Sequence, residues 1–389
     1  MRIALIALTD FQRFPTGGIL TFVRRFLESV SGTQGVSVAL IGWSPHSTNG
    51  RRAVVRVGAS ELEFHSVCEA RFSGMVPDRL QFYGDRNRWK EALSAVGDVD
   101  VYYCHSPEAA LRVAQSGRSA PIALHLHGAI NTIGRSRFAL GRFRPITALY
   151  ESTILSSAVR RARAVFATVS ESDFQAFRRG RLVEDDVLCQ RIPAMVTLPS
   201  RPGGQTPGGG RIRMVCVGRV ESIKGIDLLV RTTRRLIDRG TLCELKVIGE
   251  GSQRGRLERL AAELGLGSAV RFLGALSQAE VYGMLAESHV FLSGSYQEGF
   301  SLALLEALST GLPAVVTDVG SAREVIRNGV TGYVVERRDP DLFASCITAA
   351  ASARWSMRDN CEATALHYNC DRVSSGIMDS LNRVALAAG

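Results

Sequence analysis

Two glutamates, Glu298 and Glu306, lie within one segment that runs from Gly294 to Pro313. The segment predicts a turn followed by a helix that starts near Phe300 or Ser301. The free backbone N–H groups and the positive dipole end of such a helix form an anion site suited to a diphosphate. One carboxylate lies just outside the helix and the other within it. Both can therefore border one bound molecule and accept hydrogen bonds from sugar hydroxyls.

Two cations occur in a second segment, Gly218-Arg219-Val-Glu-Ser-Ile-Lys224-Gly225, directly after a predicted strand at Met214–Val217. Arg219 offers a bidentate fork and Lys224 a mobile point charge, and this pairing suits a diphosphate. Because all four charged residues follow strands of one predicted domain, we expect them to converge on one ligand. The alternative is a set of solvated surface charges with a helix cap.

The elements that must position these residues alternate between apolar β-branched runs and helical patterns. Such alternation indicates right-handed βαβ units and parallel sheets covered on both faces. The Pro/Gly-rich stretch 199–210 interrupts the pattern, which then restarts. The sequence therefore predicts an α/β protein with two Rossmann-like doubly wound domains: residues 1–199, completed by a carboxyl-terminal helix in 371–389, and residues 200–370. The predicted strands are 3–8, 36–41, 99–103, 122–126 and 164–169, then 212–217, 244–248, 270–272, 290–292 and 314–317.

Ligands of doubly wound sheets bind beyond the carboxyl ends of the strands. We therefore expect the two domains to face each other across a cleft at those ends. In the first domain, Gly17 and Gly18 follow the first strand and open the helix that begins at Ile19. Glycines there let the backbone approach phosphate or sugar, although a purely structural tight turn is an alternative.

The histidines at the end of one strand are a further candidate. His125 and His127 lie on one face of the strand by period-two spacing. His127 is nearest the strand end, and the alternative is a satisfied core histidine. His105 is a weaker candidate.

The second half of the sequence resembles the carboxyl-terminal domain of the retaining GT-B glycosyltransferases of family four. The resemblance rests on Glu298 and Glu306 as the family's paired glutamates and extends more loosely to Gly17-Gly18 and Leu124–Gly128. The matching motifs are Gly218-Arg219, Lys224-Gly225, Val247-Ile-Gly249-Glu-Gly251, Phe272-Leu-Gly274, Glu298-Gly-Phe300 and Leu305-Glu-Ala307.

The resemblance implies a role for each matching position. Arg219 and Lys224 would hold the donor diphosphate and neutralise it as it leaves, Glu306 would bind the ribose and Glu298 the donor sugar. His127 would lie beside that sugar, and Gly274 with its neighbours would meet the base. Gly249 of the Val247–Gly251 motif would belong to the same donor site. Four residues would face the phosphates through their backbone: Gly299, Phe300, Ser301 and Leu302.

The resemblance is incomplete at three places. Ala194-Met-Val-Thr197 stands where relatives carry Asn-Gly-Val-Asp, which removes an expected hinge-loop contact. Gly294 replaces a common Pro and Ser301 a frequent Gly. Neither of these two positions has a charged role.

The net charge of +10 is uneven, because residues 1–200 carry eight of the ten excess positive charges. The stretch 131–163 contains one acid and seven arginines. Such a patch attracts phosphates or an anionic membrane surface; a solvated arginine-rich face is the alternative. The patch residues taken as candidates for acceptor or membrane contact are Arg135, Arg137, Arg142 and Arg144.

Other classes are disfavoured. The chain lacks the Gly-x-Gly-x-x-Gly dinucleotide motif and a nucleic-acid recognition motif. Asp98-Val-Asp100 and Asp339-Pro-Asp341 fit a strand start and a helix cap better than a metal site. The eight cysteines indicate reduced core residues, and the absence of a membrane-spanning segment or signal peptide favours a cytoplasmic protein, peripheral at a membrane if the arginines dock there.

The sequence thus predicts a metal-independent, retaining transfer of a hexose or amino-hexose from a UDP- or GDP-sugar, UDP preferred, to a hydroxyl acceptor. The acceptor could be a glycolipid, a polysaccharide or a secondary-metabolite precursor, and no cofactor is expected. One alternative is an epimerase of the same fold, which would isomerise the donor alone. Another is a non-catalytic nucleotide-sugar sensor or membrane-docked scaffold.

Overall fold

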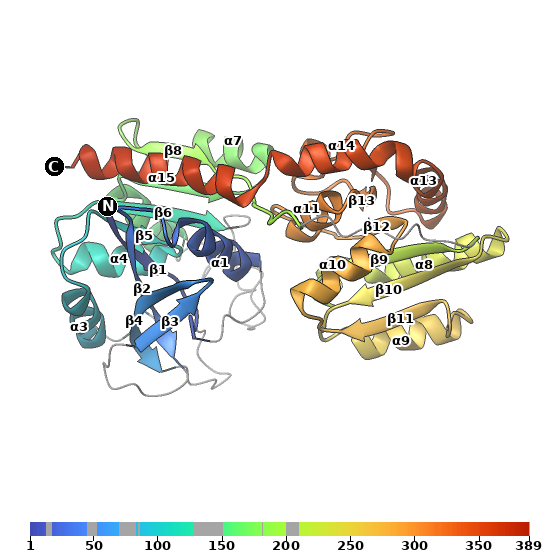
Figure 1. Ribbon diagram of the computed structural model, residues 1–389, viewed down its shortest axis with the longest axis horizontal. Helices are drawn as coiled ribbons and strands as arrows, with labels where there is room; N and C mark the ends of the chain where they lie inside the picture. The colour runs from blue at the N-terminus through green and yellow to red at the C-terminus, as the bar shows by residue number, and fades with distance from the viewer. Residues whose placement is uncertain are drawn as a thin grey trace. The chain divides into compact units, whose positions relative to one another are not determined.

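The computed structural model describes residues 1–12, 18–44, 53–69, 83–84, 86–127, 151–180, 182–199 and 210–388. These residues form two compact units (Figure 1). Unit 1 comprises Met1–Pro193 with Cys370–Gly389, and unit 2 comprises Ala194–Asn369. The first change of unit thus falls a few residues before the Pro/Gly-rich stretch, most of which lies outside the described residues.

Unit 1 contains an eight-stranded sheet in the order β3-β4-β2-β1-β5-β6-β7-β8. Every neighbouring pair is parallel except the antiparallel pair β3 and β4. The strands are β1 (Arg2–Ile6), β2 (Ser37–Ser44), β3 (Ala53–Val57), β4 (Ser60–Glu69), β5 (Val101–Cys104), β6 (Ile122–His127), β7 (Ala164–Thr168) and β8 (Leu188–Arg191). The helical elements are α1 (Gly18–Val30), α3 (Arg86–Val96), α4 (Pro107–Gln115), η2 (Glu151–Leu155), α6 (Ser156–Arg161), α7 (Glu171–Arg179) and α15 (Cys370–Leu386).

Unit 2 contains a six-stranded, wholly parallel sheet in the order β11-β10-β9-β12-β13-β14. Its strands are β9 (Ile212–Val217), β10 (Cys243–Ile248), β11 (Val270–Gly274), β12 (Val290–Ser293), β13 (Ala314–Thr317) and β14 (Gly332–Val335). The helical elements are η3 (Ser222–Lys224), α8 (Ile226–Asp238), α9 (Arg254–Glu263), α10 (Gln278–Ala286), α11 (Leu302–Ser309), α12 (Ala322–Val325), α13 (Pro340–Ser352) and α14 (Arg354–Leu366).

Two separate apolar clusters show that the sheet of unit 2 is covered on both faces. On one side Leu236 of α8 and Phe343 of α13 pack with buried strand residues. On the other side Leu308 of α11 and Cys361 of α14 do the same. Burial on both faces is what continuous apolar runs such as Ala314–Thr317 require. The expected doubly wound α/β architecture is therefore confirmed.

The hairpin formed by β3 and β4 was not among the predicted strands, and neither were β8 and β14. In β4 charged and apolar residues alternate over Glu61–Phe64, and in β3 exposed and buried residues alternate over Val54–Val57. This alternation marks an edge with one solvated face instead of a fully buried strand. Gly58 joins β3 to β4 with φ at 59°, in the left-handed region that glycine favours.

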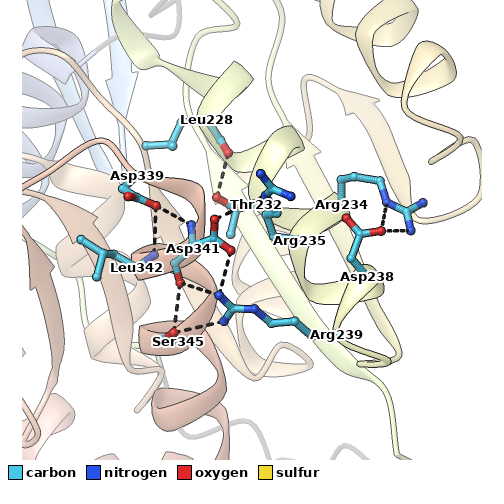
Figure 2. A network of polar contacts seen from close by, with 10 residues as sticks. All are labelled: Leu228, Thr232, Arg234, Arg235, Asp238, Arg239, Asp339, Asp341, Leu342 and Ser345. Atoms are coloured by element: carbon cyan, nitrogen blue, oxygen red, sulfur yellow. Dashed lines mark hydrogen bonds and ion pairs between the residues drawn. The ribbon is translucent and has the colours of Figure 1, made fainter.

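Several elements away from the site agree with the sequence. Asp339 caps α13 by accepting from the backbone N–H groups of Asp341 and Leu342, at 2.7 and 3.3 Å. Arg239, the residue that follows α8, reaches the same segment by bonding the Asp341 carboxylate at 2.8 Å (Figure 2). Asp100 accepts from the Arg2 N–H at 2.6 Å at the start of β5. Both aspartate pairs therefore have structural contacts.

Within the described residues, none of the helices combines the length and the hydrophobicity that a membrane-spanning helix needs.

Candidate active site

The order of strands in unit 2 identifies where a ligand would bind. β9 lies next to β12, and the strand sequence runs outward in opposite directions from this pair. Such a switch point opens a crevice at the carboxyl ends of the two strands. Arg219 follows β9, and Glu298 follows β12. Two of the predicted charged residues, Arg219 and Glu298, therefore follow the two strands that flank the switch point.

Lys224 and Glu298 meet across this edge. The Lys224 Nζ atom lies 2.6 Å from Glu298 Oε1, with side-chain exposures of 25% and 14%. The same carboxylate oxygen accepts from Ser295 Oγ at 2.6 Å. Salt screens a partly buried ion pair less than a surface pair. Removing either residue would leave the other charge partly buried without its partner.

A third cation, Arg338, holds the two loops that carry this pair. Its guanidinium donates to the Gly294 carbonyl and stacks 3.5 Å from the centre of the Tyr296 ring. The Tyr296 N–H in turn donates to the Ile223 carbonyl at 2.8 Å, which links the Glu298 loop to the Lys224 loop.

Arg338 was missed by sequence reasoning, because in the run Glu336-Arg337-Arg338 it reads as a solvated charge. Gly225 offers a partial signal. Its φ is 54°, and a Cβ there would lie 2.0 Å from the Gly294 carbonyl oxygen and 2.5 Å from Arg338 Nη2. Only glycine lets the two loops approach this closely.

The helix start predicted near Phe300 or Ser301 is confirmed. Ser301 is the N-cap of α11, and its hydroxyl accepts from the Leu304 N–H at 3.4 Å. A small cavity lies beside this helix end. It is lined by Glu298, by four hydroxyl-bearing residues and by four apolar residues, namely Ser293, Ser301, Thr317, Ser321, Leu304, Val316, Val319 and Ala322. The cavity combines a helix amino end, a carboxylate and hydroxyls, which are groups that bind phosphate and sugar oxygens.

The remaining predicted residues of unit 2 lie at the same edge. Arg219 is exposed, and Glu306 is half-buried in the second turn of α11. Gly299 and Phe300 form the turn before α11, and Leu302 is its first residue. Of the four charged residues, Lys224 and Glu298 are in direct contact.

Gly249 and Gly274 have a backbone role of their own. The Gly249 N–H donates to the Gly274 carbonyl at 2.7 Å, and a Cβ on Gly249 would lie 2.0 Å from the Gly218 carbonyl oxygen. The Glu250 carboxylate lies against Gly274 and bonds Arg254 at 2.6 Å. Glycine is therefore required at position 249 by packing, whichever ligand binds nearby.

At the carboxyl edge of unit 1 the described residues form a neutral cluster. His105 follows β5, His127 ends β6 and Thr168 ends β7. His105 Nδ1 and His127 Nε2 are 2.7 Å apart. His125 bonds the Tyr103 hydroxyl through Nδ1 at 2.6 Å and Thr168 Oγ1 through Nε2 at 2.8 Å.

Burial keeps all three histidines uncharged. Desolvation lowers the pKa of His127 to about 3. It also lowers the pKa values of His105 and His125 well below the ordinary value, and the neighbouring histidines lower them further. Phe22 of α1 contacts the cluster edge to face, with ring centres 4.9 Å from His125 and 5.0 Å from His127. The cluster can thus exchange hydrogen bonds but carries no charge near neutral pH.

Some predictions fall outside the described residues, namely Gly17 and the patch arginines Arg135, Arg137, Arg142 and Arg144. Gly18 is described and begins α1. Of the neighbouring basic residues, Arg160, Arg161 and Arg163 are exposed, and Arg163 lies 3.5 Å from Asp186.

With this geometry established, comparisons define the class of domain. Residues 204–367 match the family described as glycosyl transferases group 1. The match covers almost all of unit 2, including Lys224, Glu298 and Glu306. The match agrees with the predicted resemblance to glycosyltransferases over these residues.

One curated relative and two solved structures illustrate the similarity. The chain is 29% identical over 174 residues to D-inositol 3-phosphate glycosyltransferase of Streptomyces griseus subsp. griseus, an alignment that covers 42% of this chain and 37% of the relative. It thus spans well under half the length of that relative.

In fold, the chain is similar over 100% of both chains to sucrose-phosphate synthase of Thermosynechococcus elongatus, with a TM-score of 0.79 at 18% identity. A trehalose-6-phosphate structure from E. coli bound with UDP-2-fluoro glucose gives a TM-score of 0.74 at 14% identity, covering 98% and 99% of the two chains. The protein has the GT-B fold of two parallel-sheet α/β domains.

Proposed function

We propose that this protein is a retaining glycosyltransferase of family four that moves a hexosyl or amino-hexosyl group from a UDP- or GDP-sugar to an acceptor hydroxyl. The observation that carries the proposal is the Lys224–Glu298 pair, which lies beside the amino end of α11 at the switch point of the unit 2 sheet. The matched family region contains the same residues.

The Lys224–Glu298 pair suggests how the negative charge of a bound diphosphate would be neutralised. The Lys224 ammonium has three donors and gives one to Glu298, so among the described residues two remain for a diphosphate. Arg219 is exposed and can add a bidentate contact, and the amino end of α11 adds its dipole. Together they would stabilise the negative charge that develops on the leaving diphosphate, without a metal ion.

Glu298 is suited to bind the sugar and not to attack it. Its Oε1 atom accepts from both Lys224 and Ser295, which fixes the carboxylate in place. The remaining oxygen can accept from ring hydroxyls. Because Glu298 is held in this way, we propose attack from the same face as the departing diphosphate, whose oxygen takes the acceptor proton.

The matched region lies in unit 2, where we place the nucleotide-sugar donor. It therefore supports the proposed donor more than the proposed acceptor. The relative named above acts, by its name, on D-inositol 3-phosphate. For this chain we propose a hydroxyl acceptor of the glycolipid, polysaccharide or secondary-metabolite type. The arginines of the stretch 131–163 would bring an anionic or lipid-linked acceptor to unit 1.

The test begins with the protein and a panel of UDP- and GDP-sugars in a thermal-shift assay, because a ligand that binds only the native state raises the apparent stability. The donor found is then incubated with acceptor candidates, and the anomeric configuration of the product is measured by NMR. A product with the donor's configuration supports the proposal, and an inverted product contradicts retention.

Two controls separate the alternatives. Isomerisation of the donor in the absence of acceptor would favour an epimerase. Donor binding with turnover at background, equal in the wild type and Glu298→Gln, would favour a sensor. For the arginine stretch, equal sedimentation with neutral and acidic liposomes would remove the proposed membrane contact.

A further inference from the structure

The histidine cluster of unit 1 contains one polar atom that the proposed reaction does not use. His105 is only 7% exposed, and its Nε2 atom has no hydrogen-bond partner in the described part of the chain. Its other nitrogen, Nδ1, lies 2.7 Å from His127 Nε2. Because one nitrogen of the buried His105 ring is hydrogen-bonded and the other is not, the position of the ring's proton is restricted.

The two rings are nearly coplanar. Their planes differ by 16° and their centres are 5.0 Å apart. The 5.0 Å between the ring centres is close to the 2.7 Å between the two nitrogens plus one ring radius on each side. The rings therefore lie edge to edge and not face to face. The hydrogen bond is therefore in the plane of both rings. One nitrogen must carry the proton and the other must offer its lone pair.

The geometry does not favour a metal ion, although the ligand atoms of His105, His125 and His127 lie within 4.8 Å of one another. His125 stacks on His127 at 4.2 Å with 14° between the planes. Lone pairs of stacked, nearly parallel rings point along separate planes and do not converge on one tetrahedral centre. In addition, both nitrogens of His125 are bonded to Tyr103 and Thr168.

The unbonded atom decides between the two directions of the hydrogen bond. If His127 donated, His105 would carry its second proton on Nε2 and bury an N–H group without an acceptor. If His105 donates through Nδ1, its own Nε2 atom carries no proton, and only a lone pair is buried without a partner. Buried donors without partners are rarer than underused acceptors, which favours the second arrangement.

We propose that His105 is a positioning residue that holds His127 in the tautomer with its proton on Nδ1. His127 then presents an N–H donor at the carboxyl end of β6. The ligand it recognises is an oxygen acceptor, such as a sugar hydroxyl or phosphate oxygen, and His127 does not act as a base there. The proton assignment stands on the free protein, and only the identity of the ligand depends on the proposed function.

The first experiment reads the protons directly. Protein labelled with ¹⁵N-histidine is measured by long-range ¹H–¹⁵N NMR at pH 7.5, and His105→Asn and His127→Asn identify the signals. We expect a protonated Nδ1 and a bare Nε2 on both His105 and His127. A protonated Nε2 on His127 would overturn the proposal, as would loss of both nitrogen signals on adding Zn²⁺ at one equivalent.

The second experiment tests the positioning role with matched variants. Asn at position 105 retains an N–H donor near the site of Nδ1, Asp offers only an acceptor, and Leu offers neither. We expect His105→Asn to keep the Nδ1-protonated form of His127, and His105→Asp to reverse it. Unchanged His127 signals in His105→Asp would show that His105 does not set the tautomer.

Ligand binding then links the tautomer to recognition. With UDP and UDP-glucose as probes in calorimetry, His105→Asp should weaken UDP-glucose about five- to tenfold, as expected for one lost hydrogen bond. UDP binding unchanged within about twofold would place the accepting oxygen on the sugar, and an equal loss for UDP would place it on the diphosphate. His105→Asn should stay close to wild type. If neither probe binds, the proposed UDP-sugar donor is contradicted, but the NMR result still stands. If all variants bind UDP-glucose equally, the recognition role of His127 is overturned.

Discussion

The carboxyl edges of the two sheets are built from opposite chemistry. In unit 2 the edge is charged, with Arg219 exposed and Lys224 bonded to Glu298. In unit 1 the histidine cluster at this edge is uncharged, because burial lowers the pKa values of His105, His125 and His127. The comparison teaches that the same strand-end geometry can serve two tasks. A charged edge is suited to a diphosphate, and an uncharged edge reads hydroxyl positions through hydrogen bonds.

The largest effect should come from removing the ammonium group of the charged edge. Lys224→Met should lower kcat/KM for glycosyl transfer by about a hundredfold or more, since preorganised charge stabilises the transition state. The variant also leaves Glu298 partly buried and unpaired. The measurement is steady-state kinetics with the donor found by thermal shift.

Glu298→Gln and the double variant complete a cycle for this pair. If the two residues act as one unit, the double variant should lose much less than the product of the single losses. Multiplicative losses would show that Lys224 and Glu298 act independently, and a transfer rate unchanged in Lys224→Met would remove the charged edge from the reaction.

The second largest effect concerns acid and should fall on unit 1. The pKa of His127 is about 3 in the folded protein and near its usual value when unfolded, so protons bind the unfolded chain preferentially. Stability is complete above about pH 6.5 and declines as the pH falls from there toward 3, by up to about 1.4 kcal/mol per pH unit for each such histidine.

Urea unfolding at pH 7.5 and 5.5 measures this decline. Trp43 and Trp89 report on unit 1, and Trp355→Phe removes the tryptophan of unit 2. His127→Asn should flatten the dependence, whereas the exposed His367→Asn should not. Equal slopes in the wild type and His127→Asn would show that the cluster is not the source.

A smaller effect is expected at the loop clamp of unit 2. Arg338→Met removes the bond to the Gly294 carbonyl and the cation stacked on Tyr296. We expect kcat/KM to fall about tenfold, because Glu298 would be less well held. Arg338→Lys should recover only part, since a lysine cannot stack and donate as a planar fork. Wild-type kinetics in Arg338→Met would mean that the loops hold their positions unaided.

The smallest effect should come from a single neutral hydrogen bond in unit 1. Thr168→Val removes the partner of His125 Nε2 and should cost about 1 kcal/mol of unfolding free energy, and Thr168→Ser should cost less because it keeps the hydroxyl. Urea unfolding compares the two. A Val variant as stable as the Ser variant would show that this hydrogen bond contributes nothing net.

The sequence predicted the fold of unit 2 closely because its central strands contain short buried apolar runs. Met214–Cys216 within β9 and Ala314–Thr317 of β13 are buried, and the structure forms strands over the predicted ranges 212–217 and 314–317. The β3–β4 hairpin escaped prediction because its alternating residues carry a weaker signal than a buried run.

Contacts within the site were less predictable than the positions of its residues. The motifs placed Lys224 and Glu298 at strand ends, but their direct pairing depends on how two loops fold over each other. Arg338 and the His105–His127 bond join residues far apart in sequence. Such contacts are set by tertiary packing, which neither propensity nor periodicity reports.

The last described helix, α15, groups with unit 1 although the whole of unit 2 precedes it in the chain. Its Ser380 bonds Gln190 of β8 at 2.6 Å, and its Asp371 accepts from Ser29 of α1 at 3.1 Å. During synthesis on the ribosome, unit 2 can finish folding while unit 1 still waits for its closing helix. A circular permutant that places α15 ahead of Met1 would reverse that order of completion, and the amino-terminal unit would then fold first.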